Sequence, residues 1–350
     1  MSYFNGMTLH TFELSMNITK DEAQAYSNYL YEEATRLGAR CYRNNGWLNF
    51  YGYQKAGIKI SLRFSENAPG ALIRLRINPS VLSGNTDPTE LFLPDRTHMD
   101  SITALLGVLI QDLLGERTIY DFALNRLDLC RNIYLENQEI LTEYLRLLNK
   151  GANRSNWNEE CFGDERDAHS FRRYCAAYEV TVYDKIYELQ QEDRSRYQQE
   201  PFQWTRKDRI LRVETSLLRE GIRRQIEKLD ITSSIAWPDL MVKFSEAGPS
   251  IMSDLLDQLV TDSTYYRLDK ARTAIECSGF RRNKTDKLCE FLSKINQKQS
   301  LDTSKIRKMK NGEKRLQQLY GLGINPITIE ARAGINTLPS IQELLKKTPV

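Results

Sequence analysis

Residues 125–133 read NRLDLCRNI and residues 211–217 read LRVETSL, and these two stretches decide the predicted fold. A β-strand sends every second side chain to the same face, so Arg126 shares a face with Asp128, and Arg212 shares one with Glu214. The leucines and valines between them are typical of a strand whose opposite face is buried. The sequence therefore predicts a sheet with one apolar face and one charged face.

A third stretch, VYDKIYELQ at residues 182–190, continues this pattern. Within a strand it puts Tyr183 and Lys185 on one face. If the three strands lie side by side, one side of the sheet carries carboxylates, cations and a phenol at close quarters. Such a set of groups is typical of metal-assisted phosphodiester chemistry.

The rest of the chain predicts an α+β fold in which helices pack on one side of a largely antiparallel sheet of about seven strands. Beyond residue 231 helical periodicity replaces the strand signals. The predicted domains are a sheet domain over residues 1–224, a helical basic domain over 225–333 and a tail over 334–350. We expect strands over 7–18, 39–53, 58–64, 71–77, 118–134, 171–189 and 209–218, and helices over 19–36, 99–114, 136–148, 236–246, 251–260, 268–277 and 341–347.

Composition favours a soluble cytoplasmic protein. The chain has 350 residues, 41% of them hydrophobic, and no apolar run approaches the roughly 20 residues that span a bilayer. The N-terminus lacks the cationic region and apolar core of a signal peptide. The six cysteines include no Cys-x-x-Cys pair and there are only three histidines, so we expect reduced thiols and no zinc cluster.

Positive charge is concentrated in residues 281–320, which contain twelve basic residues and four acidic ones. A local excess of this size attracts a polyanion, and a phosphate backbone is the usual one. The alternative is a solvated, lysine-rich helical face. The residues expected to contact DNA here are Arg281, Arg282, Lys284, Lys305, Arg307, Lys308 and Lys310.

Four blocks, at residues 73–85 (IRLRINPSVLSGN), 125–133, 182–190 and 211–217, occur in the order seen in the gene II replication proteins of filamentous phages. The chain resembles that family, and related phage and plasmid rolling-circle initiators, over separated blocks within residues 70–220. The resemblance implies an endonuclease that nicks one strand at a duplex origin. In the family a tyrosine retains the 5′-phosphate covalently, frees a 3′-hydroxyl and later rejoins the displaced strand.

The resemblance also implies partners and a location. These are origin DNA as duplex and single strand, a host helicase and polymerase, and the cytoplasm of a bacterial host, with the oligomeric state left open. Better-known relatives bind metal through a His-hydrophobic-His motif. Here that motif is absent, because His10, His98 and His169 are isolated in the sequence.

Carboxylates are the expected ligands, because Mg²⁺ and Mn²⁺ prefer their oxygens. The candidates are Asp128, Glu214 and Glu188, with Glu179 in reserve. The alternative is that Arg126 with Asp128, and Arg212 with Glu214, form ion pairs that only stabilise the sheet. Lys185 is expected to hold the phosphate or to lower the pKa of a phenol, unless it merely pairs with a carboxylate.

Tyr197 is the expected nucleophile, since it lies between the blocks at residues 182–190 and 211–217, where the phage relatives carry theirs. Arg194 and Arg196 would favour its phenolate and bind phosphate. Tyr183 is the second choice, because a position inside a strand suits packing better than attack. Three other functions stay open at this point: a relaxase of a conjugative element, a non-catalytic origin-binding protein or repressor, and a structural or scaffolding protein without salt-dependent DNA affinity. Arg126 and Arg212 complete the residues expected to contact DNA.

Overall fold

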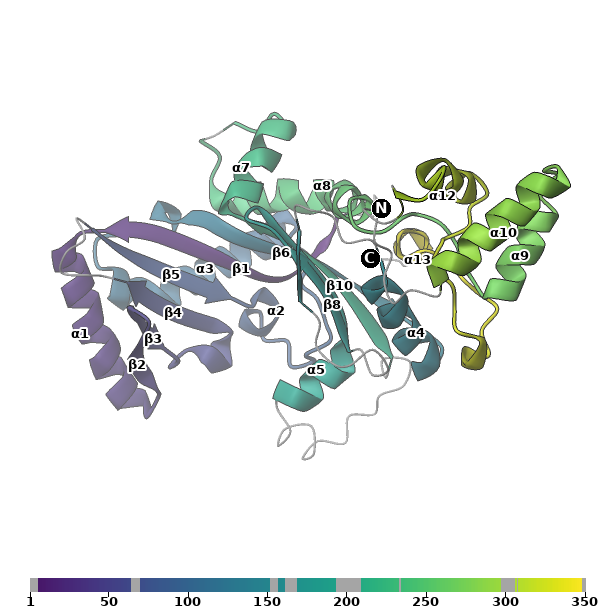
Figure 1. The fold of residues 1–350 in the computed structure, drawn as a ribbon. Coiled ribbons are helices and arrows are strands. Elements are labelled where there is room, and N and C mark those ends of the chain that lie inside the picture. Colours follow the sequence, from purple (N-terminus) through teal and green to yellow (C-terminus); the bar gives the residue numbers. More distant parts are fainter. Residues whose placement is uncertain are drawn as a thin grey trace.

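The computed structural model describes residues 6–63, 70–151, 157–160, 169–192, 209–232, 234–296, 306 and 308–347. Its centre is a ten-stranded sheet in the order β2-β3-β4-β5-β1-β6-β10-β9-β8-β7, in which every neighbouring pair is antiparallel (Figure 1). The predicted α+β class is confirmed. The strands are β1 Thr8–Ile18, β2 Cys41–Asn44, β3 Trp47–Phe50, β4 Ile58–Arg63, β5 Ala71–Ile77, β6 Ala123–Tyr134, β7 Asn158–Glu160, β8 Ser170–Tyr174, β9 Tyr178–Asp184 and β10 Ile210–Leu218.

The helices of the sheet region begin and end at local signals in the sequence. Thr19 and Glu22 form a reciprocal capping box at the start of α1, and Gly38 ends that helix in the left-handed conformation. Pro79 ends β5 and opens α2, because it has no N–H to donate to a strand ladder. The helices are α1 Lys20–Leu37, α2 Pro79–Leu82, α3 Arg96–Leu114, α4 Gln138–Asn149, α5 Lys185–Glu192, α7 Arg219–Lys228 and α8 Trp237–Asp257.

The two faces of the sheet differ as the alternation predicts. On one face, apolar side chains of the central strands, such as Leu129 and Val213, are fully buried. Helices α1, α3 and α8 pack on this side, and Trp237 of α8 stacks on Phe12 of β1 with ring centroids 5.6 Å apart. The other face carries polar and charged side chains and is partly open to solvent. The candidate site lies on this polar face.

A β-bulge in β1 changes which side chains reach the polar face. Leu9 pairs with Leu129, whereas Phe12 pairs with Leu127, so one extra residue of β1 is accommodated between the two pairs. Both His10 and Thr11 reach acceptors on the polar face as a result. The bulge is visible in the sequence as a change of phase, because apolar residues are odd-numbered at Leu9 and even-numbered from Phe12 onward.

Several predicted strands are shorter than expected. Residues 39–53 contain the hairpin β2–β3, joined by Asn45 and Gly46 with φ of 49° and 78°, as a two-residue type I′ turn requires. Residues 171–189 were expected to form one strand and instead form most of β8, β9 and the first turns of α5. The carboxylate of Asp184 accepts the backbone N–H groups of Ile186 and Tyr187 and so starts α5. The prediction that Tyr183 and Lys185 share a strand face is therefore wrong.

Helix α8 is continuous where two helices were expected, although Pro249 lies inside it. A proline has no N–H to bond the carbonyl four residues earlier, which here belongs to Ser245. That carbonyl accepts the N–H of Met7 at 2.7 Å instead, and the hydroxyl of Ser245 donates to the carbonyl of Met7 at 2.6 Å. The chain before β1 thus satisfies the group that the proline leaves open.

The region after α8 contains α9 Leu268–Glu276, α10 Arg282–Asn296, α12 Gly312–Gly321, α13 Ile341–Lys347 and a two-stranded sheet of β11 Tyr265–Tyr266 and β12 Thr337–Leu338. It lies beyond α4 at one end of the sheet (Figure 1). The predicted domain boundary at residue 225 falls inside α7, and α8 beyond it packs into the core of the sheet. The helical region joins α4 through the hydroxyl of Tyr144, which donates to the carbonyl of Pro339 at 3.0 Å.

A candidate active site on the polar face of the sheet

Strands β6, β10 and β9 are adjacent, so the polar face brings together most of the described site residues that the sequence suggested. Cys130 pairs with Glu214, and Asp128 pairs with Ser216 two residues further along β10. Asp128 is therefore the diagonal neighbour of Glu214 on the same face, a separation of about 7–8 Å between the two backbones. Thr181 of β9 pairs with Glu214 from the other side.

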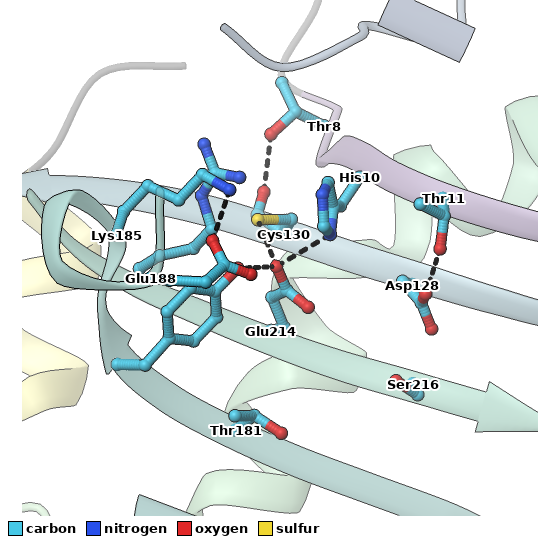
Figure 2. Close-up of polar contacts among 12 residues, drawn as sticks. Thr8, His10, Thr11, Asp128, Cys130, Thr181, Lys185, Glu188, Glu214 and Ser216 are labelled. Atoms are coloured by element: carbon cyan, nitrogen blue, oxygen red, sulfur yellow. Dashed lines mark hydrogen bonds and ion pairs between the residues drawn. The ribbon is translucent and has the colours of Figure 1, made fainter. Parts of the chain in front are cut away.

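Glu214 is the centre of the cluster in Figure 2. Its Oε1 accepts a hydrogen bond of 2.6 Å from the hydroxyl of Tyr183 and lies 2.9 Å from Nδ1 of His10. The thiol of Cys130 lies 3.8 Å from the same oxygen. Three side chains from three different strands thus converge on one carboxylate oxygen.

The surroundings hold Glu214 in its ionised form. Burial raises the pKa of this carboxyl, but His10 and the buried guanidinium of Arg212 lower it by more, so that the pKa lies well below its usual value. Burial, followed by the negative charge of Glu214, raises the pKa of the Tyr183 phenol well above its usual value. Tyr183 is therefore a neutral hydrogen-bond donor to a charged carboxylate.

Asp128 is held by other side chains of the polar face. Nε of Arg126 donates to its Oδ1 at 2.7 Å, and the hydroxyl of Thr11 donates to Oδ2. Arg126 also donates to the hydroxyl of Ser216 at 2.9 Å. Only 1% of the Asp128 side chain is exposed. The ion pair that the sequence offered as the alternative for Arg126 and Asp128 is present.

Arg212 does not form the ion pair with Glu214 that the sequence offered as the alternative, and it is not available to DNA. Its side chain is fully buried. Its Nε donates to Oδ1 of Asn132 and one terminal nitrogen donates to the backbone carbonyl of Thr89, both at 2.8 Å. The prediction that Arg212 contacts DNA is therefore corrected: it is a buried cation beneath the cluster. Arg126 is partly exposed and lines a hollow on the polar face.

Lys185 and Glu188 reach the cluster from α5 rather than from a strand (Figure 2). The Lys185 ammonium is buried and forms an ion pair with Oε2 of Glu188. Glu188 is close enough to Tyr183 and Arg212 to act on both electrostatically. Glu179, the reserve ligand, binds Arg172 at 2.9 Å and lies 3.8 Å from Arg126.

As the side chains stand, no group of three or more His, Cys, Asp or Glu residues within the described part of the chain is arranged to hold a metal ion. The donors nearest to such a group are Glu214 and His10, with Asp128 as diagonal neighbour. The carboxylates suit Mg²⁺ or Mn²⁺, whereas an imidazole ligand favours a softer ion than Mg²⁺ and so favours Mn²⁺ of the two. The contacts that His10 makes with Glu214, and that Arg126 and Thr11 make with Asp128, would compete with such an ion.

His10 is the site residue that the sequence analysis missed. It was set aside as isolated, yet it makes one of the two closest contacts of Glu214. The change of hydrophobic phase between Leu9 and Phe12 would have indicated a bulge and a polar orientation for His10. No local signal indicates that β1 pairs with β6.

Some predicted residues lie outside the described part of the chain: Tyr197, Arg194, Arg196, Lys305 and Arg307. In the helical region, Arg281, Arg282, Lys308 and Lys310 are exposed. Lys284 and Arg281 line a hollow of about 510 Å³ between α10 and α12, together with Lys287, Lys314 and Arg315. No acidic residue is among the described residues that line this hollow, so its potential is positive.

Within the described residues, no helix combines the length and apolar character that crossing a membrane requires. No family model matches the chain, and no curated protein matches it. Among solved structures, the chain is similar to DynU16, a protein of the dynemicin biosynthetic locus, with 9% identity over 70% of this chain and 97% of that one. The TM-score is 0.19, too low for the likeness to bear on fold or function.

Proposed function

We propose that the chain nicks and rejoins one strand of DNA through a tyrosine, as an initiator of rolling-circle replication. The observation that carries this proposal is the ionised carboxylate of Glu214, which meets His10 and Tyr183 on a polar sheet face beside Arg126 and Asp128. A carboxylate, an imidazole and cations close together suit cleavage of a phosphodiester, because that reaction must move a proton and stabilise added negative charge.

Tyr197 is the proposed nucleophile. Its oxygen would attack phosphorus and the P–O3′ bond would break, which leaves a 5′-phosphotyrosine and a free 3′-hydroxyl that takes up the phenolic proton. Tyr183 is less suited to this role, because it is buried, protonated and already hydrogen-bonded to Glu214.

The number of residues between α5 and Tyr197 is compatible with Tyr197 as the nucleophile. It lies five residues beyond Glu192, the last residue of α5. Five residues span at most about 18 Å when fully extended. Glu188 on the same helix already belongs to the cluster, and four helical residues advance about 6 Å along the axis. The chain between Glu192 and Tyr197 is thus long enough for the proposed attack at a phosphate site bordered by Glu214 and Arg126.

Mg²⁺ or Mn²⁺ remains part of the proposal, with Glu214, His10 and Asp128 as the donors that would hold it. When bound, such an ion polarises the phosphate and stabilises the leaving oxygen. Glu188 is less suited as a ligand than the sequence suggested, since Lys185 neutralises it. Lys185 in turn is buried, so its expected part is to hold Glu188 and α5 beside the cluster.

The basic hollow between α10 and α12 is the proposed binding site for duplex origin DNA. Its five lining cations would displace counterions from a phosphate backbone. Binding of a duplex should therefore weaken steeply with salt.

The test uses a supercoiled plasmid that carries the matching origin. Wild-type protein with Mn²⁺ should convert it to the nicked form and remain covalently attached to the 5′ end. Tyr197→Phe should abolish the adduct, whereas Tyr183→Phe should retain it. An adduct that persists in Tyr197→Phe and disappears in Tyr183→Phe would reverse the assignment. Absence of any nicking by wild-type protein would refute the enzymatic proposal.

A non-catalytic origin-binding protein is the second candidate, favoured by the basic hollow and by the protein contacts that already occupy Asp128. It would bind origin duplex without any adduct, and Lys284→Ser with Lys314→Ser would remove its activity. The nicking assay separates the two, because only the first function needs Glu214.

A further inference from the structure

The polar face continues away from Glu214 across β1, β5, β4 and β3. Cross-strand pairing aligns Lys59 of β4 with Arg76 of β5, Arg76 with Glu13 of β1, and Glu13 with Arg126 of β6. Adjacent strands lie about 4.8 Å apart, so this row extends about 14 Å from Arg126 to Lys59. It connects the edge of the candidate site to the far half of the sheet (Figure 1).

Two aromatic rings on this half of the sheet are flanked by cations. The guanidinium groups of Arg74 and Arg63 lie 4.4 Å and 5.4 Å from the ring centre of Trp47. The ammonium of Lys59 lies 4.9 Å from the ring centre of Tyr51. Trp47 is half-buried, as is Tyr51, so each ring keeps part of its surface accessible. A cation over an aromatic ring holds the ring in place. A base stacked on Trp47 would take the place of one of the two guanidinium groups that lie over that ring.

Two hollows on the polar face adjoin here. One, of about 310 Å³, is lined by Trp47, Lys59, Arg74 and Arg76. The other, of about 870 Å³, is lined by Arg126 and by residues of α7. Glu13 and Arg74, which form an ion pair at 3.6 Å, line both hollows, so the two adjoin along the face. An elongated ligand could lie from Trp47 to Arg126.

Charge and shape indicate the chemistry of that ligand. Glu13 is the one acidic residue among the described residues that line the smaller hollow, against the three cations Lys59, Arg74 and Arg76. A track of cations interleaved with aromatic rings matches a chain of phosphates with planar bases. Stacking on Trp47 needs bases whose faces are free, which a duplex does not offer.

We infer that the face formed by β3, β4 and β5 binds single-stranded DNA, with a base stacked on Trp47 and phosphates along Lys59, Arg74 and Arg76. The inference rests on the proposed function for the role of this strand, which would be the one that runs into the nicking site. It extends the function by assigning the single strand to the sheet and the duplex to the helical region.

The test measures binding of a fluorescein-labelled 12-nucleotide oligothymidine by anisotropy, without added metal and over a series of salt concentrations. Trp47→Ala should weaken binding roughly tenfold or more and leave the salt dependence unchanged, because it removes stacking. Lys59→Ser with Arg76→Ser should also weaken binding. It should reduce the slope of log K against log salt by about 1.4, because each phosphate contact on a single strand contributes about 0.7. Lys243→Ser with Lys347→Ser, two exposed lysines elsewhere, is the matched control and should bind like wild type.

Circular dichroism spectra that match wild type would show that the variants fold. Wild-type affinity in both face variants, or no oligothymidine binding by wild type, would overturn the inference. Equal binding of a 12-base-pair duplex, lost equally in both variants, would also overturn it, since the face would then be a duplex site. Nicking of the plasmid is scored separately. A protein that binds oligothymidine through Trp47 but nicks nothing would refute the proposed function and leave this inference standing.

Discussion

Replacing Glu214 by Gln keeps the size of the side chain and one acceptor oxygen but removes its negative charge. In the native cluster the charged carboxylate of Glu214 accepts a hydrogen bond from the Tyr183 hydroxyl. Its Oε1 lies 2.9 Å from Nδ1 of His10, and it lies close to the buried guanidinium of Arg212. Hydrogen bonds to charged groups contribute about 1.5–3 kcal/mol, and neutral ones about 0.5–1.5 kcal/mol. The two closest contacts should therefore weaken by about 1 kcal/mol each.

The loss of electrostatic attraction to Arg212 destabilises the folded protein further, because the substitution leaves that buried cation without a nearby negative charge on residue 214. Relief of the desolvation of Glu214 offsets part of the loss. The depressed pKa of Glu214 shows that attraction exceeds desolvation in the folded protein. We expect Glu214→Gln to lower the free energy of unfolding by about 2–4 kcal/mol at pH 7.

Urea unfolding followed by circular dichroism measures this change, with Glu220→Gln as the matched control. Glu220 lies on α7 and pairs with the exposed side chains of Arg223 and Arg224, so its replacement should change stability little. A double-mutant cycle with Tyr183→Phe should give a coupling of about 1–2 kcal/mol between Tyr183 and Glu214. Equal effects of Glu214→Gln and Glu220→Gln, or a coupling near zero, would refute this account of the cluster.

Other consequences can be measured independently. Because the pKa of Glu214 is lowered on folding, its contribution to stability is complete above about pH 4.5 and is lost as the pH falls from there through the folded pKa. Between these two pH values, wild-type stability should fall more steeply than that of Glu214→Gln, by up to about 1.4 kcal/mol per pH unit. A parallel pH dependence of the two proteins would argue against an ionised Glu214. Gly221→Ala should destabilise the protein by about 1–3 kcal/mol or more, because a Cβ there would lie 2.2 Å from the backbone oxygen of Ala177. In contrast, a Cβ at Gly107 in α3 would meet nothing within 4 Å, so Gly107→Ala should stabilise the protein by up to about 1 kcal/mol. The same urea assay would contradict this reading if both substitutions had the same sign. Removal of divalent ions with EDTA should stop nicking of the origin plasmid and leave oligothymidine binding unchanged; nicking that persists after chelation would exclude the proposed metal.

Local sequence signals predicted much of the secondary structure. The capping residues Thr19 and Gly38 mark the ends of α1, and the Asn78-Pro79 step marks the end of β5, because caps and proline act on the backbone beside them. Alternation in 125–133 and 211–217 assigned Asp128 and Glu214 to one face correctly. The junction at Asp184 was missed, since the capping carboxylate there follows a strand with no break in pattern.

The sequence by itself determined the α+β class, the polarity of each sheet face and the positive charge of the helical region, because these follow from residue type and a period of two or 3.6. Only the tertiary structure decided that β1 lies against β6 and that its bulge turns His10 toward Glu214. It also decided that the N–H of Met7 bonds the Ser245 carbonyl, which Pro249 cannot bond, and that Arg212 is buried. Each of these depends on which strands and helices become neighbours, and that choice is made by packing between residues far apart in the chain.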